Sequence, residues 1–197
     1  MKINNNLYSL DAVDLAKKLL GKILVRNING IEIESKIVEV EAYNGAADKA
    51  NHAFGGLKSA RTEPMFMEGG HVYVFLIYGM YSCFNIVCGK ENEPHAVLIR
   101  AVEPLNNIEF IKQNRKIKSK KIIDLTNGPG KLSKALMIDK SFNKIDLKSS
   151  KDIYIKENLL DKFDIVEEKR VNIDYAEEYK DKLWRFYIKE NPFVSVK

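Results

Sequence analysis

The chain has 197 residues and a mass of 22.6 kDa, with 45% hydrophobic and 30% charged residues. This composition is typical of a globular protein with one or two domains and excludes a mainly disordered chain. A formal net charge of +5 and a pI near 9.0 exclude a strongly acidic protein, and they permit a polyanionic partner without requiring one.

The sequence also argues against membrane, secreted and metal-binding proteins. Its longest mainly apolar run, Val72 to Tyr81, is far shorter than the roughly 20 residues that span a bilayer, and the N-terminus has no apolar signal region. Cys83 and Cys88 match no redox or zinc spacing, and the three histidines form no ligand cluster. We therefore expect a cytoplasmic protein without membrane contact, metal or cofactor.

The first elements are a helix and a β-hairpin. Ser9 is a suitable N-cap for a helix from Leu10 to Leu20. A strand from Ile23 to Ile28 follows. Asn29-Gly30 then predicts a type I′ turn, because both central residues of that turn need positive φ. The return strand is predicted from Ile31 to Tyr43.

Side chains along this return strand should alternate between two faces. One face carries an apolar set near the strand end, Val38, Val40 and Ala42. The other carries two carboxylates and a phenol, Glu39, Glu41 and Tyr43. Residues earlier in the strand are expected to share this second face: Ile33, Ser35 and Ile37.

A long loop and further strands follow. The loop from Asn44 to Glu68 lacks a periodicity of its own, and loops of this length are often functional. Strands are predicted from Val72 to Ile77, from Met80 to Cys88 and from Ala96 to Val102. The first two flank an aromatic tip, Tyr78-Gly79-Met80-Tyr81.

The rest of the chain predicts helices and a final strand. One helix runs from Asn106 to Lys116, and Gly128-Pro129-Gly130 opens another, since proline is tolerated in the first helical turn. The stretch from Lys140 to Lys182 is charge-rich with short apolar runs, and Leu183 to Val196 is strand-like. We expect residues 1–197 to form a single mixed α+β domain dominated by antiparallel strands.

Basic residues are concentrated between positions 112 and 134, where eight stand against Asp124 alone: Lys112, Arg115, Lys116, Lys118, Lys120, Lys121, Lys131 and Lys134. Lysine, arginine and the backbone N–H groups at helix starts are the usual contacts to phosphate. The helix start at Gly128-Pro129-Gly130-Lys131 therefore suits a polyanion. A solvated lysine-rich surface explains the run equally well.

Two other features have both a binding and a structural interpretation. An aromatic tip such as Tyr78-Gly79-Met80-Tyr81 can wedge between base pairs, or it can pack inside its own hairpin. Asn85 lies in an otherwise apolar strand, where its amide can contact a base edge or satisfy a backbone group. Taken alone, the tip favours a packed hairpin, whereas the pattern of residues does not decide the role of Asn85.

A carboxylate beside an aromatic ring at a strand end suits a general base above a flat substrate. Glu41 with Tyr43 fits this description, since the ordinary glutamate pKa of about 4.3 leaves it ionised at neutral pH. Arg100 ends an apolar run and needs an anionic partner if it points inward. Glu39 faces the same way as Glu41, so the pattern does not choose between them, and structural ion pairs remain the alternative.

Several longer motifs follow one another in order along most of the chain. They are Leu15-Ala16-Lys17-Lys18-Leu19-Leu20-Gly21, Val38-Glu39-Val40-Glu41-Ala42-Tyr43, His52-Ala53-Phe54-Gly55-Gly56, Arg61-Thr62-Glu63-Pro64-Met65-Phe66, the stretch from Tyr73 to Tyr81, Cys83-Phe84-Asn85, the stretch from Leu98 to Pro104, and Asn127-Gly128-Pro129-Gly130-Lys131-Leu132. With these motifs, the chain resembles bacterial members of the alkyladenine (3-methyladenine) DNA glycosylase family.

The resemblance implies a curved antiparallel sheet, similar to the open C-terminal barrel of formyltransferases, surrounded by helices. It implies a monomeric, monofunctional DNA glycosylase of base excision repair that works at the bacterial nucleoid. Such an enzyme flips damaged purines out of duplex DNA and hydrolyses the N-glycosidic bond to leave an abasic site. The implied substrates are 3-methyladenine and other alkylated purines, with hypoxanthine and ethenoadenine as further candidates. The resemblance implies no lysine nucleophile, metal or cofactor.

The resemblance also implies roles for individual residues. Glu41 corresponds to the general base, and Arg100 to the arginine that helps to hold the attacking water. The base pocket would be lined by Tyr43, His52 and Phe75, while Asn85 would crowd the exocyclic amino group of guanine. Phe75 stands where animal members carry tyrosine, so a hydrogen bond through that hydroxyl is missing here.

DNA contacts are expected outside the pocket as well. Tyr78 would fill the gap left in the duplex, with Met80 beside it. Phosphate contacts are expected from the second helix start, at Gly128, Gly130, Lys131 and Lys134. This arrangement requires the lysines of the basic segment to lie on the same side of the molecule as Glu41 and Tyr78.

Three other functions fit parts of the sequence. A bifunctional glycosylase/lyase would form a covalent adduct with DNA that borohydride traps. A non-catalytic nucleic-acid-binding module on the same fold would bind DNA without releasing a base. A small-molecule hydrolase could use Glu41 in a pocket, with an activity that does not depend on salt-sensitive DNA binding.

Overall fold

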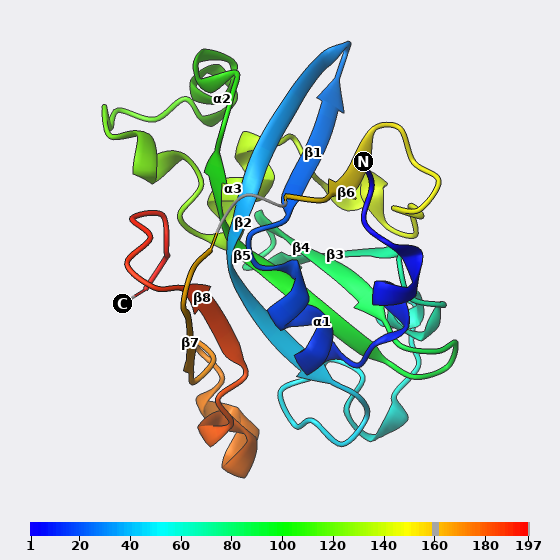
Figure 1. Ribbon diagram of the computed structural model, residues 1–197. Coiled ribbons are helices and arrows are strands. Elements are labelled where there is room, and N and C mark those ends of the chain that lie inside the picture. The colour runs from blue at the N-terminus through cyan, green and yellow to red at the C-terminus, as the bar shows by residue number, and fades with distance from the viewer. Residues whose placement is uncertain (159–161, 197) are drawn as a thin grey trace.

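A computed structural model describes residues 1–158 and 162–196 of the chain. It has a mixed α+β fold built on one eight-stranded sheet in which all strand pairs are antiparallel. The main path of the sheet is β3-β4-β5-β2-β1-β6, while β8 pairs with β2 and with β7. Figure 1 shows the long β2 strand curving through the middle of this sheet. The sheet is not closed into a barrel, and the predicted fold class is confirmed.

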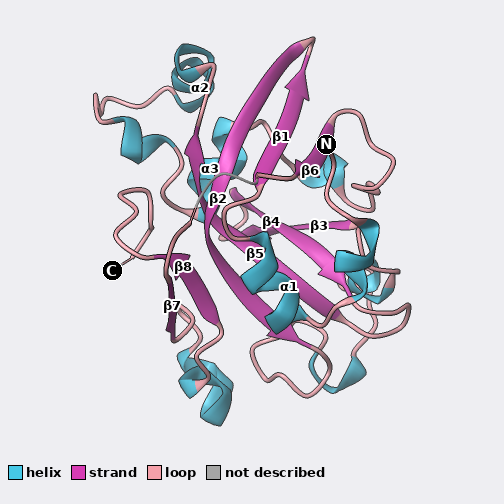
Figure 2. Ribbon diagram, viewed as in Figure 1, coloured by secondary structure: helices cyan, strands magenta, loops and turns pink. Residues whose placement is uncertain are grey.

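The strands are β1 (Ile23–Ile28), β2 (Ile31–Asn44), β3 (Val72–Ile77), β4 (Tyr81–Cys88), β5 (His95–Pro104), β6 (Ile153–Lys156), β7 (Ile165–Glu168) and β8 (Arg185–Ile188). The α-helices are α1 (Ala12–Leu19), α2 (Ile108–Arg115) and α3 (Pro129–Ala135). Short 3₁₀ turns lie at Asn5–Ser9, Phe54–Gly56, Glu63–Phe66, Ile122–Leu125, Lys140–Phe142 and Asp174–Asp181. Figure 2 shows the helices arranged around the sheet. No helix in the described residues is long and apolar enough to cross a membrane.

The N-terminal helix begins later than predicted. Ser9 lies in a preceding 3₁₀ turn, and Asp11 caps α1 by accepting a hydrogen bond from the Asp14 backbone N–H at 2.9 Å. Ser9 is therefore not the cap of this helix. The hairpin is confirmed, because β1 has the predicted bounds and Asn29 and Gly30 both have positive φ, 51° and 84°.

The return strand β2 contains a β-bulge that changes which side chains share a face. Ile37 pairs with Val102 and Glu39 with Ala101, so Val38 is an extra residue on β2. Residues on both sides of the bulge therefore join one hydrophobic core: Ile33, Ile37, Val38, Val40 and Ala42. The prediction that Ile33, Ser35 and Ile37 share a face with Glu39, Glu41 and Tyr43 is wrong, because the extra residue shifts the alternation by one.

Other element bounds differ from the predictions by small amounts, except at the C-terminus. The predicted strand from Leu183 to Val196 is regular only over β8, and the chain then turns repeatedly. The predicted helix from Asn106 to Lys116 is α2, and the predicted strand from Met80 begins at Tyr81. The loop after β2 is anchored to the sheet by a small apolar cluster. Members of this cluster come from the loop and from β3, β4 and β5: Ala53, Met65, Phe66, Tyr73, Val87 and Ala96.

Candidate active site

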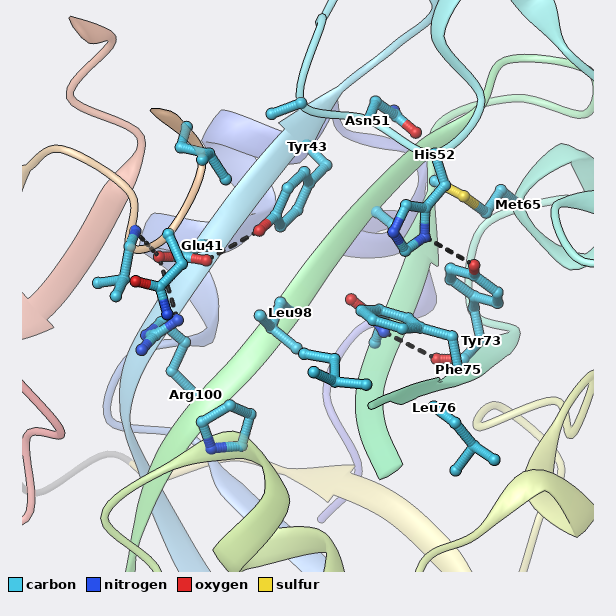
Figure 3. A pocket seen from close by; sticks show the side chains of 18 of the residues that line it. Glu41, Tyr43, Asn51, His52, Met65, Tyr73, Phe75, Leu76, Leu98 and Arg100 are labelled. Atoms are coloured by element: carbon cyan, nitrogen blue, oxygen red, sulfur yellow. Dashed lines mark hydrogen bonds and ion pairs between the residues drawn. The ribbon is translucent and has the colours of Figure 1, made fainter. Parts of the chain in front are cut away.

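A pocket of about 500 Å³ opens where the ends of several strands meet the long loop. Its lining comes from β2, β3, β4, β5, the loop from 44 to 68, the start of α3 and residues 171–175. Figure 3 shows two different sides, with Glu41 and Arg100 on one side and His52, Tyr73 and Phe75 on the other. Tyr43 lies between them, and its hydroxyl is directed toward Glu41.

Glu41 is held by three groups at the acidic side of the pocket. Its side chain is fully buried. One oxygen, Oε2, accepts a hydrogen bond from the Tyr43 hydroxyl at 2.9 Å, while Oε1 accepts one from the Val171 backbone N–H at 2.7 Å. Arg100 Nη1 lies 3.3 Å from Oε1. The carboxylate therefore lines the cavity in a fixed orientation and in a mainly protein environment.

Arg100 reaches both candidate carboxylates because it occupies a bulge of its own. Glu39 pairs with Ala101 and Val40 with Ile99, so Arg100 is the extra residue on β5. Its Nε donates to Glu39 Oε1 at 3.2 Å, while Nη1 lies beside Glu41. Glu39 and Glu41 thus both serve as the anionic partner that the buried Arg100 requires.

Glu39 differs from Glu41 in its partners and in its access to the pocket. Arg185 Nη1 donates to Glu39 Oε1 at 3.0 Å, and the Ser195 backbone N–H donates to Oε2 at 2.7 Å. Together with Arg100, these contacts engage both oxygens of Glu39. Glu41 lines the pocket and Glu39 does not. The geometry favours Glu41 as the group that can meet a bound molecule, whereas Glu39 orients Arg100.

Tyr43 acts as a hydrogen-bond donor toward Glu41. Burial, and secondarily the negative charge of Glu41, raise the pKa of the Tyr43 hydroxyl well above its usual value. The phenol therefore stays protonated and keeps donating to the carboxylate. Its ring forms part of the pocket wall, where a flat molecule can stack.

The aromatic side of the pocket is organised around His52. Its Nδ1 lies 2.9 Å from the Tyr73 hydroxyl, and its Nε2 lies 3.2 Å from Nη2 of Arg61. The ring centroids of His52 and Phe75 are 4.5 Å apart in an edge-to-face arrangement. Since arginine can only donate, Nε2 accepts the hydrogen bond, so the neutral ring carries its proton on Nδ1.

This environment should keep His52 neutral at physiological pH. Burial, and secondarily the positive charge of Arg61, lower the pKa of His52 from 6.5 to about 4. The unfolded chain binds this proton near pH 6.5 and the folded chain only near pH 4, so stability is lost as pH falls between these values. We expect an NMR titration of His52 to have its midpoint near pH 4. A midpoint near 6.5 would contradict this arrangement, and His52→Gln should weaken the dependence of unfolding on pH in this window.

Asn85 lines the pocket while its amide also satisfies backbone groups. Its Nδ2 donates to the Tyr73 carbonyl at 3.0 Å and to the Cys83 carbonyl at 3.1 Å. The interpretation that its amide satisfies backbone groups is confirmed, while a contact between Asn85 and a base edge stays a prediction. Because both amide hydrogens are used, the group has a fixed orientation and can offer only its carbonyl oxygen to a ligand.

The aromatic tip between β3 and β4 projects into solvent. Tyr78 is 83% exposed, Met80 69% and Tyr81 51%. Tyr78 also lines the pocket mouth, and it has a positive φ of 52° followed by 70° at Gly79. A tip packed inside its own hairpin is excluded by this exposure.

The start of α3 lies against the same hairpin. Pro129 lines the pocket, and a Cβ atom on Gly130 would stand 3.1 Å from the Cβ of Tyr81. Gly128 precedes the helix with a φ of 158°, and Lys131 Nζ donates to Asn127 Oδ1 at 2.7 Å. The start of α3 thus lies beside the pocket and the aromatic tip, and Lys134 is exposed further along this helix. The phosphate contacts of Gly128, Gly130, Lys131 and Lys134 stay a prediction.

Several site residues had no role in the sequence interpretation. Tyr73 and Arg61 lie within recognised motifs, so the motifs could have suggested them. Val171 acts through its backbone N–H, for which a sequence has no signal. Arg185 reaches Glu39 because β8 pairs with β2, and Ser195 reaches it from the turns that follow β8. In the parts of the chain that the structure describes, no group of three or more His, Cys, Asp or Glu residues could hold a metal ion.

Comparisons with known proteins show what the chain is similar to. The family model described as "Methylpurine-DNA glycosylase (MPG)" matches residues 6–192. A protein of Natranaerobius thermophilus is 53% identical over 197 residues, and one of Clostridium tetani is 52% identical over 203 residues. A Clostridium perfringens protein is 50% identical over 205 residues. All three are covered over their full length and over all of this chain, and each is named "Putative 3-methyladenine DNA glycosylase".

Proposed function

We propose that the protein excises damaged purines from duplex DNA in base excision repair. The chain belongs to the methylpurine-DNA glycosylase family and is a DNA glycosylase, which supports this proposal. The reaction is hydrolysis of the N-glycosidic bond, with free base and an abasic site as products. The observation that carries this proposal is the Glu41–Arg100 pair on one side of a pocket whose other side is aromatic. The proposed substrates are 3-methyladenine and other alkylated purines, with hypoxanthine and ethenoadenine as further candidates.

Binding begins on the phosphates and continues in the groove. Lys131 and Lys134, with the backbone at Gly128 and Gly130, contact the phosphates beside the pocket mouth. Tyr78 enters the duplex with Met80 beside it and takes the place of the rotated nucleotide. Flipping costs a few kcal/mol, and less for a mispaired or damaged base, which itself selects for lesions.

The flipped purine lies between Tyr43 on one side and His52 and Phe75 on the other. A cationic base such as 3-methyladenine is attracted by the aromatic faces and is already a good leaving group. A neutral base such as hypoxanthine needs protonation to leave. Asn85 crowds the position of the exocyclic amino group of guanine, and Phe75 supplies a stacking face without a hydroxyl.

Hydrolysis takes place at the acidic side of the pocket. The Glu41 carboxylate accepts a proton from water while the water oxygen forms a bond to C1′ and the bond from C1′ to the purine nitrogen breaks. Arg100 holds the water, and the charge of Glu41 stabilises the oxocarbenium-like sugar in the transition state. Among the described residues that line the pocket there is no lysine, which supports a monofunctional enzyme without a Schiff-base step.

The proposed enzyme is a monomer in which residues 1–197 form one glycosylase domain that works on DNA of the bacterial nucleoid. A base-release assay tests the proposal. Duplexes carrying alkylated, deaminated and etheno-modified purines are incubated with the protein, and free bases are separated by chromatography. Release of 3-methyladenine is the expected result. DNA binding without release of any base would favour the non-catalytic module, and a borohydride-trapped adduct would favour a lyase.

The exposed tip gives a prediction of its own. Stacking of one aromatic side chain on bases is worth about 1–3 kcal/mol, so Tyr78→Ser should lower affinity for lesion duplex or the rate of flipping by roughly 5- to 160-fold. Tyr154→Ser, which alters a tyrosine on β6 away from the pocket lining, is the control. Fluorescence from a base analogue opposite the lesion measures flipping. Unchanged affinity and flipping in Tyr78→Ser would remove the wedge role.

A further inference from the structure

A buried arginine behind the pocket wall has no role in the reaction described so far. Arg170 follows β7, and its side chain is completely buried without lining the pocket. Its Nη1 donates to Asp48 Oδ2 at 2.6 Å, and its Nη2 donates to Asp48 Oδ1 at 2.9 Å. This bidentate pair joins the segment after β7 to the long loop after β2.

Asp48 shapes the start of that loop. Its Oδ2 also accepts a hydrogen bond from the Asn44 backbone N–H at 3.1 Å, and its Oδ1 accepts one from the Ala50 N–H at 3.0 Å. Each carboxylate oxygen of Asp48 thus accepts one hydrogen bond from Arg170 and one from a backbone N–H group. The loop then runs directly into His52 at the aromatic side of the pocket.

The same guanidinium supports Tyr43. Nη1 of Arg170 donates to the Ala42 carbonyl at 2.9 Å, which fixes it to the end of β2. Its Cζ lies 4.9 Å from the Tyr43 ring centroid and 5.1 Å from that of Trp184. A planar guanidinium stacks on aromatic faces, so Arg170 contacts the tyrosine that forms the wall of the base slot without entering the slot itself.

The residue after Arg170 contacts the catalytic carboxylate. The Val171 backbone N–H donates to Glu41 Oε1 at 2.7 Å, and Val171 lines the pocket. Holding Arg170 therefore also holds this N–H in place. One buried side chain links the two groups whose mutual placement decides whether base and water meet at C1′.

We propose that Arg170, paired with Asp48, is a positioning residue of the reaction: it sets the plane of Tyr43 and, through Val171, the orientation of Glu41. This inference rests on the proposed function, because it assigns Tyr43 to the base and Glu41 to the water. Lysine cannot reproduce the role, since an ammonium group is a point charge without a planar face and cannot make the bidentate contact.

Arg170→Lys tests this role while keeping a positive charge beside Asp48. We expect the single-turnover rate of 3-methyladenine release to fall roughly 10- to 100-fold, because small misplacements of reacting groups have effects of this size. Affinity for a duplex with an abasic site, which has no base to stack, should change little. A purely structural role would instead lower folded fraction, rate and binding together.

Arg26→Lys is the matched control. Arg26 is also buried, its Cζ lies 4.5 Å from the Phe142 ring centroid, and its Nη1 donates to the Asp152 carbonyl at 3.2 Å, yet it does not line the pocket. The same substitution there should leave the rate of base release unchanged. An equal loss in both variants would overturn the positioning role.

A double variant covers the case in which Arg170→Lys does not fold. Arg170→Met with Asp48→Leu removes both buried charges together and should lose the same rate without losing DNA affinity. If either variant folds and releases base at the wild-type rate, this inference is overturned and the proposed function is not affected. Wild-type protein that releases no base from any lesion duplex overturns the proposed function, and this inference with it.

Discussion

Replacement of Glu41 by glutamine should lower the single-turnover rate of base release by roughly 10²–10⁴-fold, the usual contribution of a positioned general base. Glutamine has the same shape, and its carbonyl oxygen can still accept the hydrogen bond from Val171 that Glu41 accepts at 2.7 Å. What the amide cannot do is take a proton from water or stabilise a positive sugar. The measurement is release of 3-methyladenine with enzyme in excess over DNA.

Binding serves as the control for this variant. Glu41 is buried, whereas the aromatic tip is exposed, so Glu41→Gln should retain affinity for lesion duplex and for abasic-site DNA. Retained turnover at the wild-type rate would show that another group activates the water. Loss of binding together with turnover would show that the carboxylate organises the DNA surface instead.

The same substitution at Glu39 should act on stability. Glu39 is completely buried and accepts hydrogen bonds from Arg100 at 3.2 Å, from Arg185 at 3.0 Å and from the Ser195 N–H at 2.7 Å. Removing one partner of a buried ion pair leaves uncompensated charge and costs about 3–5 kcal/mol. We therefore expect Glu39→Gln to lose about 3–5 kcal/mol in free energy of unfolding, measured by urea denaturation.

Glu41→Gln provides the comparison for this measurement. Among the residues that the structure describes, Glu41 has one ion-pair partner, Arg100, at 3.3 Å, and Arg100 keeps Glu39 when Glu41 becomes neutral. The free energy of unfolding should therefore fall less in Glu41→Gln than in Glu39→Gln. Equal stability of Glu39→Gln and wild type would mean that Arg185 and Arg100 find other partners and that Glu39 is not the anchor of the cluster.

Much of the fold was predictable because its signals are local. The period-2 pattern and the Asn29-Gly30 turn determine β1 and the hairpin, and both were correct. The bulge at Val38 was not visible, because an extra residue in a strand depends on pairing with a distant strand. The cap at Asp11 was missed because Ser9 and Asp11, separated only by Leu10, both suit an N-cap.

The candidate site was predictable in part for the same reason. Glu41, Tyr43 and Arg100 were identified from strand ends and motifs, and the structure brings them together at one side of the pocket. Residue patterns did not separate Glu41 from Glu39, because the difference lies in Arg185 and Ser195, more than 140 residues further along the chain. Contacts made by a backbone N–H, as at Val171, have no side-chain signature at all.

The charge distribution also became interpretable only in three dimensions. A net charge of +5 is too small to identify a DNA-binding protein. The start of α3 lies against Tyr81 and beside the pocket that Glu41 lines, so Lys131 and Lys134 belong to a helix next to this pocket. A positive surface next to a carboxylate in a pocket suits an enzyme that binds phosphates and then hydrolyses a bond within the DNA.

The most direct test compares the two carboxylates in one experiment. Wild type, Glu41→Gln and Glu39→Gln are incubated with methylated duplex at a temperature where each is folded, and free 3-methyladenine is measured per folded molecule. We expect Glu41→Gln to release almost none, while Glu39→Gln loses far less of the rate, because a glutamine oxygen at position 39 can still accept the hydrogen bond that orients Arg100. Release by Glu41→Gln at the wild-type rate, or a selective loss in Glu39→Gln, would contradict the assignment of Glu41 as the general base.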